Sequence, residues 1–177
     1  MLVMTRPIGV GILANALKTG VIEQEDIAAS TLARITGDNA FGRTLSETPE
    51  VSSLTDITGF GLIGHISELV GLGQLDVDLN TGSLVFYDGT ESLAVAVTSA
   101  DSGIFSNIKK YAQNVEYLAD LPLAKKFLLH DPQTNGGLLF TVSAEGFEQN
   151  RQRWQALCPD LIIIGRMTEG TGKIKVY

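Results

Sequence analysis

Apolar positions alternate with polar ones in some stretches of the chain and recur every three or four residues in others. The segment Gln74–Leu79 alternates, with Leu75, Val77 and Leu79 on one side, which predicts a half-buried strand. In Leu62–Val70 the apolar residues recur at helical spacing, which predicts a helix. The same patterns predict further strands at Leu2–Met4, Val51–Asp56, Leu138–Val142, Leu161–Ile164 and Lys173–Val176, and further helices at Ile12–Lys18, Gln24–Ile35, Pro122–Leu129 and Ala144–Leu157.

Other stretches give weaker or mixed signals. Gly71 and Gly73 are expected to end the helix that precedes them, because glycine favours the turn after a helix. The apolar run Leu93–Val97 fits a strand or a helix, and the polar segment Gly103–Tyr111 is predicted to be a loop. The inward residues of the long helix near the carboxyl terminus are expected to be Phe147, Trp154 and Leu157.

Strands and helices mix along the chain without a regular alternation of one strand and one helix. This order favours an α+β fold, with a mixed β-sheet on which the helices pack. The 177 residues are enough for one domain with its own core, and we expect a single domain over residues 1–177. Because the chain opens directly on Leu2–Met4, we also expect the natural protein to carry a segment before it.

Composition and charge narrow the class of protein. Hydrophobic residues make up 44% and charged residues 19%, as in soluble globular proteins. The net charge of -7 disfavours nucleic acid as a partner, because an acidic surface repels phosphate backbones. The only cysteine, Cys158, excludes an intramolecular disulfide and favours a cytoplasmic protein with a buried, unreactive thiol. No apolar run is long enough for a membrane span, and no signal peptide is evident.

The first segment with candidate chemistry runs from Thr55 to His65. An aspartate at a predicted strand end, Asp56, is followed by three glycines, and a helix begins directly after the turn. Glycine lets the backbone approach a ligand, and a helix start exposes N–H groups that favour an anion. A carboxylate beside bound phosphates is a ligand for Mg²⁺. The residues alone leave open a plain structural turn in which Asp56 acts as a cap.

The second segment runs from His130 to Leu139. Asp131-Pro132 starts a turn, and Gly136-Gly137 allows a sharp bend before a buried strand. These polar residues either line a binding site or form a self-contained connection, and the pattern alone favours the connection.

Three motifs together resemble one family. Thr55–His65 resembles a signature of the selenophosphate synthetases (selenide, water dikinases), and His130–Leu139 is similar to their second carboxy-terminal signature. Thr5–Gly11 resembles the family's Thr-Lys-Pro-Leu-Gly-x-Gly, although Arg6 stands in place of lysine. Asn135 stands where the family usually has serine.

The resemblance implies the carboxy-terminal half of a two-domain protein. Its fold is shared with aminoimidazole ribonucleotide synthetase and has partial ferredoxin-like likeness. The family converts ATP, selenide and water to selenophosphate, AMP and phosphate, and is usually dimeric. Its amino-terminal domain, with a reactive cysteine or selenocysteine, a lysine and further metal-binding aspartates, is the partner that this chain lacks. The resemblance therefore implies no catalytic residue in this chain, which we expect to be inactive when isolated.

The resemblance also assigns residues to the binding of cofactor and substrate. It implies that Asp56 binds Mg²⁺ and that Thr58, Gly59 and Gly61 shape the loop near the ATP phosphates. Three further residues are expected to lie near the cleft between the domains: Asp131, Gln133 and Thr134.

Two alternatives stay open. One is another enzyme of the same superfamily, namely an aminoimidazole ribonucleotide or formylglycinamidine synthetase, a thiamine-phosphate kinase or a hydrogenase maturation factor. Phe60 within Thr-Gly-Phe-Gly and the run Asp131-Pro132-Gln133-Thr134 favour the selenium family over these. The other alternative is a non-catalytic domain that kept the fold and lost the chemistry.

Overall fold

A computed structural model describes residues 1–71, 74–99 and 102–177 of the chain. Its strands form one seven-stranded mixed sheet in the order β2-β5-β1-β6-β3-β7-β4. The pairs β3–β7 and β7–β4 are parallel, and the other pairs are antiparallel. The strands are β1 (Leu2–Met4), β2 (Val51–Asp56), β3 (Leu75–Leu79), β4 (Val115–Tyr117), β5 (Leu138–Val142), β6 (Ile162–Glu169) and β7 (Ile174–Val176).

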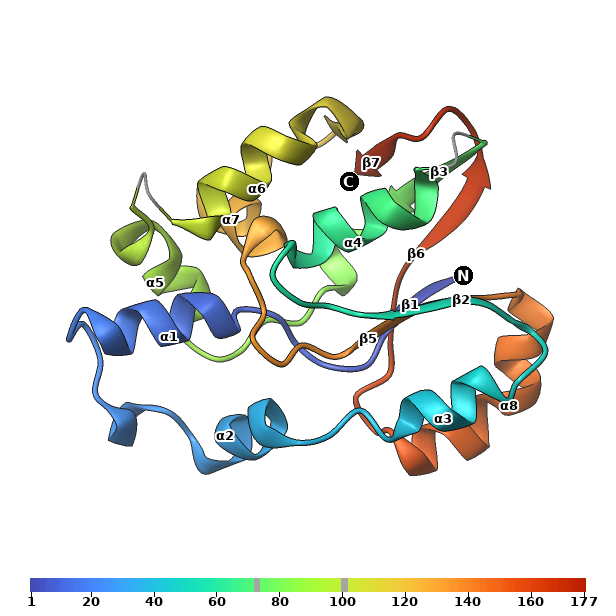
Figure 1. The fold of residues 1–177 in the computed structure, drawn as a ribbon, viewed down its shortest axis with the longest axis horizontal. Coiled ribbons are helices and arrows are strands. Elements are labelled where there is room, and N and C mark those ends of the chain that lie inside the picture. The colour runs from blue at the N-terminus through green and yellow to red at the C-terminus, as the bar shows by residue number, and fades with distance from the viewer. Residues whose placement is uncertain (72–73, 100–101) are drawn as a thin grey trace.

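Helices cover the sheet and extend beyond one end of it (Figure 1). The α-helices are α1 (Val10–Lys18), α2 (Ala29–Thr36), α3 (Phe41–Ser46), α4 (Gly61–Val70), α5 (Thr90–Val97), α6 (Gly103–Tyr111), α7 (Leu123–His130) and α8 (Ala144–Leu157). Short 3₁₀ turns lie at Gln24–Asp26, Thr81–Ser83 and Ala112–Asn114.

The two faces of the sheet bury different helices. In β1, Leu2 and Met4 join the core under α4, whereas Val3 joins the core formed with α3 and α8. This split follows from the alternation of side chains along a strand. On the second face, Trp154 of α8 is fully buried and meets the ring of Phe140 edge-on at 5.6 Å.

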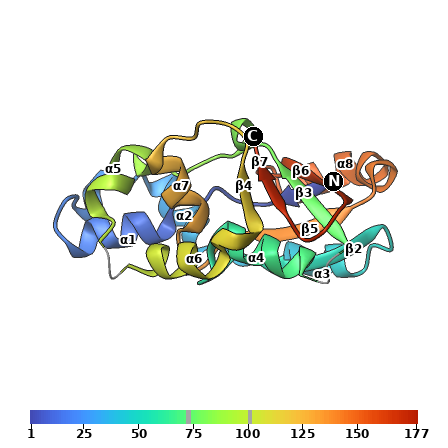
Figure 2. The same ribbon diagram turned by 90° about the horizontal axis from the view of Figure 1, so that it is seen from above.

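A separate cluster of helices lies beside the sheet. Helices α1, α5, α6 and α7 pack on one another there, as Figures 1 and 2 both show. Their shared core consists of Ile12, Ala16, Ala94, Val97, Ile104, Phe127 and Leu128. This cluster places the start of α1 and the end of α7 next to the strand ends of β2 and β5.

The α+β prediction, with its mixed sheet, is confirmed, as are the strands expected from the pattern. The loop predicted for Gly103–Tyr111 is wrong, because this segment is helix α6. Its buried residues Ile104, Asn107 and Tyr111 are spaced three and four apart, but two of them are polar or amphiphilic, which hid the helical pattern.

Two smaller expectations also need correction. The helix expected over Gln24–Ile35 is divided into a 3₁₀ turn and α2, with extended backbone at Ile27 between them. Leu157, expected in the core, is 56% exposed because α8 ends there. Leu93–Val97 is resolved as part of helix α5, and Gly73, expected to end α4, lies outside the described residues.

A buried carboxylate, which the pattern of β3 did not reveal, fixes the connection between β6 and β7. Asp76 accepts hydrogen bonds from the backbone N–H groups of Thr171 and Lys173 at 2.8 Å, and its carboxylate lies 2.8 Å from the ammonium of Lys175. The side-chain bond from Lys175 and these two backbone bonds hold the pKa of Asp76 well below its usual range. No helix among the described residues is long and apolar enough to cross a membrane.

Candidate functional site

The pairing of β2 with β5 brings the two motif segments side by side. Asp56 at the end of β2 pairs with Leu138 at the start of β5. Beyond the strands the contact continues, since Ile57 N donates to Gly137 O at 2.9 Å and Gln133 N donates to Thr58 O at 3.0 Å. The two polar segments therefore form one structural unit, although about 70 residues separate them.

The turn between β2 and α4 has a backbone shape that requires glycine at one position. Gly61 has φ +68°, and a Cβ atom there would lie 2.8 Å from the backbone carbon of His130. Both facts mean that any larger residue at this position would displace the second segment. The close approach of Gly61 to His130 thus sets the start of α4 directly against the end of α7.

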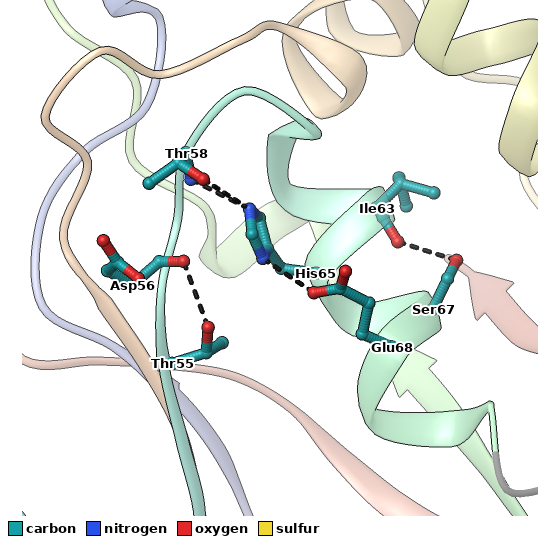
Figure 3. Close-up of polar contacts among 7 residues, drawn as sticks. All are labelled: Thr55, Asp56, Thr58, Ile63, His65, Ser67 and Glu68. Carbon is teal, nitrogen blue, oxygen red and sulfur yellow. Dashed lines mark hydrogen bonds and ion pairs between the residues drawn. The ribbon is translucent and has the colours of Figure 1, made fainter.

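His65 holds this turn from inside α4 (Figure 3). The Thr58 N–H donates to His65 Nε2 at 2.9 Å, and the Thr58 hydroxyl lies 3.2 Å from the same nitrogen. Since Nε2 accepts, the ring proton is on Nδ1, which donates to Glu68 at 3.1 Å. His65 therefore ties the turn to α4, whereas no side chain, Asp56 included, caps the start of this helix.

Asp56 has a free carboxylate at the open end of β2. The residue is exposed, and within the described part of the chain its carboxylate takes part in no hydrogen bond or ion pair. In Figure 3 this carboxylate is directed away from the His65 ring. A free hard oxygen ligand fits Mg²⁺. No group of three or more His, Cys, Asp or Glu residues gathers among the described residues, so Asp56 would be a single ligand.

The other predicted site residues divide into exposed and buried ones. Gly59 and Thr134 are exposed and Thr58 is half-buried, so these three are accessible at the same strand ends as Asp56. Asp131 and Gln133 are 1% and 2% exposed. These two side chains point inward rather than toward solvent.

The buried pair caps helix α1. Gln133 Oε1 accepts from the N–H groups of Gly9 and Val10 at 3.1 Å each, and Asp131 Oδ2 accepts from Gly11 N at 2.9 Å. The first N–H groups of a helix have no acceptor within the helix, and these two side chains accept their hydrogen bonds. The second segment thereby fixes the start of α1 against the candidate site.

Burial shifts the pKa values of two neighbouring side chains in the second segment, Asp131 and His130. Burial raises the pKa of Asp131 to about 7, although hydrogen bonds from Gln133 and from the backbone of α1 oppose the shift. Burial lowers the pKa of His130 to about 4, so its ring is neutral near pH 7. The Tyr117 hydroxyl lies 3.3 Å from His130 Nε2.

Helix α6 contributes residues that the sequence did not single out. Asn107 donates to Gly59 O and to His130 O at 2.9 Å each, so one side chain joins both segments. The ammonium of Lys110 lies 4.4 Å from the centre of the Phe60 ring, which is within the range of a cation–π contact. A Cβ atom at Gly64 would lie 2.8 Å from the Tyr111 ring, so glycine lets α6 approach α4.

The two residues that differ from the family motifs, Asn135 and Arg6, form hydrogen bonds with backbone carbonyl groups. Asn135 donates to Ile35 O at 2.6 Å and to Gly37 O at 2.9 Å. Arg6 donates to the carbonyls of Asp38 and Asn135. Both side chains therefore tie the second segment to the loop after α2.

Cys158 lies beside the Thr5–Gly11 motif, with its sulfur 3.7 Å from Thr5 O. It is half-buried, and burial raises its thiol pKa. A raised pKa leaves little thiolate near pH 7, in line with the expected unreactive thiol.

A known family matches the chain over its full length. The family described as AIR synthase related protein, C-terminal domain, matches residues 1–177. The chain belongs to this family. Among curated relatives, "Selenide, water dikinase" of Pseudomonas straminea is 35% identical over 182 residues, covering 99% of this chain and 49% of that protein. The protein of the same name from Clostridioides difficile is 33% identical over 148 residues, covering 84% of this chain and 42% of that protein. The expected resemblance is confirmed, and the chain spans about half the length of these relatives.

Solved structures share the AIR synthase related fold at lower identity. Hydrogenase maturation protein HypE in complex with ATP aligns with a TM-score of 0.60 at 12% identity, covering 99% of this chain and 46% of that one. Thiamine monophosphate kinase from Aquifex aeolicus aligns with a TM-score of 0.56 at 17% identity, covering 99% and 48%. At these identities the likeness supports the fold alone.

Proposed function

We propose that the chain is the carboxy-terminal half of an ATP-dependent selenophosphate synthetase. The observation that carries the proposal is the free Asp56 carboxylate beside a glycine turn that is bonded to the second motif segment. The relatives named selenide, water dikinase support the same choice, because they align over 84–99% of the chain at 33–35% identity. Hydrogenase maturation proteins and thiamine monophosphate kinases resemble the chain only at the level of fold.

The proposed reaction converts ATP, selenide and water to selenophosphate, AMP and phosphate. Enzymes of phosphoryl transfer work mainly by positioning their substrates and offsetting phosphate charge. In this proposal Asp56 is the ligand that this chain offers to Mg²⁺, and Mg²⁺ would neutralise phosphate charge. Gly59 lets the backbone approach the phosphates, while Thr58 and Thr134 offer hydroxyl groups at the same edge.

In this proposal the residues that pack against the glycine turn hold the shape of the turn and do not touch ATP. His65 fixes Thr58, and Gly61 fixes the distance to the second segment. Asp131 and Gln133, first expected as ligand contacts, are proposed to act through the start of α1. The proposal assigns no catalytic residue to residues 1–177.

The proposal includes a second half of the molecule. We infer that an amino-terminal domain like that of the relatives supplies the remaining metal ligands and the reactive cysteine or selenocysteine. One carboxylate holds Mg²⁺ weakly, because the ion keeps most of its water molecules. On this basis the residues 1–177 act as one domain that is inactive alone, and the complete protein is a cytoplasmic homodimer.

Phosphorus NMR tests the proposed reaction. The polypeptide that carries both halves is incubated with MgATP and selenide under anaerobic, reducing conditions. We expect a selenium-bound phosphorus signal together with AMP and phosphate. ADP without that signal would indicate a sister enzyme of the superfamily, and no turnover would favour a non-catalytic domain.

A further inference from the structure

Asn107 occupies an unusual position between the two motif segments. It is 6% exposed and lies on the face of α6 that packs against α4 and α7. Its amide nitrogen donates one hydrogen bond to Gly59 O and one to His130 O, both at 2.9 Å. Both partners are carbonyl oxygens, which only accept, so the nitrogen of the amide must face them.

This arrangement makes the side chain hard to replace. An aspartate of the same shape would place an acceptor against two acceptors, and a leucine would leave both carbonyls without this donor. A buried polar group that loses its partner destabilises the fold, because it gives up a hydrogen bond to water without gaining another. Asn107 is therefore matched to both carbonyl groups at once.

The first of these carbonyls belongs to the exposed member of the glycine turn. Gly59 has no neighbouring atom within 4 Å of a Cβ position, so its own packing does not fix it. The hydrogen bond from Asn107 fixes the orientation of its peptide group. The second hydrogen bond anchors Asn107 to the end of α7, directly before the segment that contacts Thr58.

We propose that Asn107 is a positioning residue, which holds the Gly59 peptide group in the orientation that binds the phosphates of MgATP. The inference rests on the proposed function and adds to it a residue outside the motifs. Asn107 acts through the Gly59 backbone and does not touch the nucleotide. Its loss should therefore weaken MgATP binding without changing the binding of selenide.

The test compares Asn107→Asp with two control variants in the polypeptide that carries both halves. Ser106→Ala alters an exposed neighbour on α6, and Phe147→Leu destabilises the core on the opposite face of the sheet. The dissociation constant of MgATP, the KM values for MgATP and selenide, and the melting temperature are measured for each. If Asn107→Asp does not fold, Asn107→Ser replaces it, since a hydroxyl retains a single donor.

We expect Asn107→Asp to weaken MgATP binding about tenfold or more, which corresponds to about 1.4 kcal/mol. Its KM for selenide should stay within about twofold of the wild type, and Asn107→Ser should be intermediate for MgATP. Ser106→Ala should match the wild type, and Phe147→Leu should lower the melting temperature with unchanged MgATP affinity.

Two outcomes contradict the inference in different ways. In the first, the wild type binds MgATP, and Asn107→Asp and Phe147→Leu lower the melting temperature equally. If Asn107→Asp then loses no more affinity for MgATP than Phe147→Leu does, Asn107 is merely structural. If the wild type binds no MgATP, the proposed function is wrong and the inference fails with it.

Discussion

Replacing Asp131 by asparagine isolates the effect of one buried carboxyl group on the stability of the fold. Asp131 caps α1 through Gly11 and accepts a second hydrogen bond from Gln133 at 2.9 Å. Asparagine has the same shape and keeps one oxygen acceptor, but it does not titrate. The substitution therefore removes the pH dependence that Asp131 contributes and leaves most of the packing in place.

The size of the effect follows from the pKa of Asp131. It is about 7 in the folded chain and 3.8 in the reference state. Between these values the folded state binds a proton that the unfolded state releases, so acidification stabilises the fold. From pH 8 to pH 5 the carboxyl passes through about two pKa units of this difference, which corresponds to roughly 3 kcal/mol.

The assay is urea unfolding of the wild type and Asp131→Asn at pH 5 and pH 8, followed by the fluorescence of Trp154, the single tryptophan. The free energy of unfolding of the wild type, relative to the variant, should be roughly 3 kcal/mol higher at pH 5 than at pH 8. A constant cost of the substitution cancels in this difference. Equal pH dependence in both proteins would refute the reasoning. A difference of opposite sign would mean that the start of α1 favours the charged carboxylate.

Further predictions concern the glycine turn and the connection between β6 and β7. Gly61→Ala should lower the free energy of unfolding by at least about 1–2 kcal/mol, because alanine is strained at positive φ and its Cβ meets His130. Gly59→Ala is the matched control, and an equal loss in both variants, measured by urea unfolding, would contradict this account. Asp76→Asn should lower the melting temperature near pH 7, because the folded state stabilises the charged carboxylate. This gap should be full above pH 4 and shrink as the pH falls further, since protonation of Asp76 then destabilises the wild type; a gap that widens in acid would contradict the assignment.

Local patterns were sufficient to predict most of the fold. The alternation in β3 and the helical spacing in α4 are properties of neighbouring residues, and the structure contains both elements. Helix α6 was not predicted because its inward face includes Asn107 and Tyr111, whose burial depends on partners elsewhere in the chain. Strand β4 carried no signal of its own, being only three residues long at the edge of the sheet.

The candidate site was predictable where its residues follow a strand end. Asp56 and the glycine turn lie together in the sequence, and so their juxtaposition could be inferred. The role of Asn107 could not be inferred from the sequence, because its two partners lie 48 and 23 residues away. The resemblance places Asp131 near the interdomain cleft, but its hydrogen bond with Gly11, which is 120 residues away, could not be inferred from the sequence.

The most direct test of the proposed function is the rate of selenophosphate formation in Asp56→Asn, compared with Asp88→Asn, in the polypeptide that carries both halves. Both aspartates are exposed, but Asp88 lies in the loop before α5 and belongs to neither motif segment. The rate is followed by phosphorus NMR at several Mg²⁺ concentrations. We expect Asp56→Asn to fold normally and to lose Mg²⁺-dependent turnover, while Asp88→Asn matches the wild type. Normal turnover in Asp56→Asn would contradict the assignment of this site.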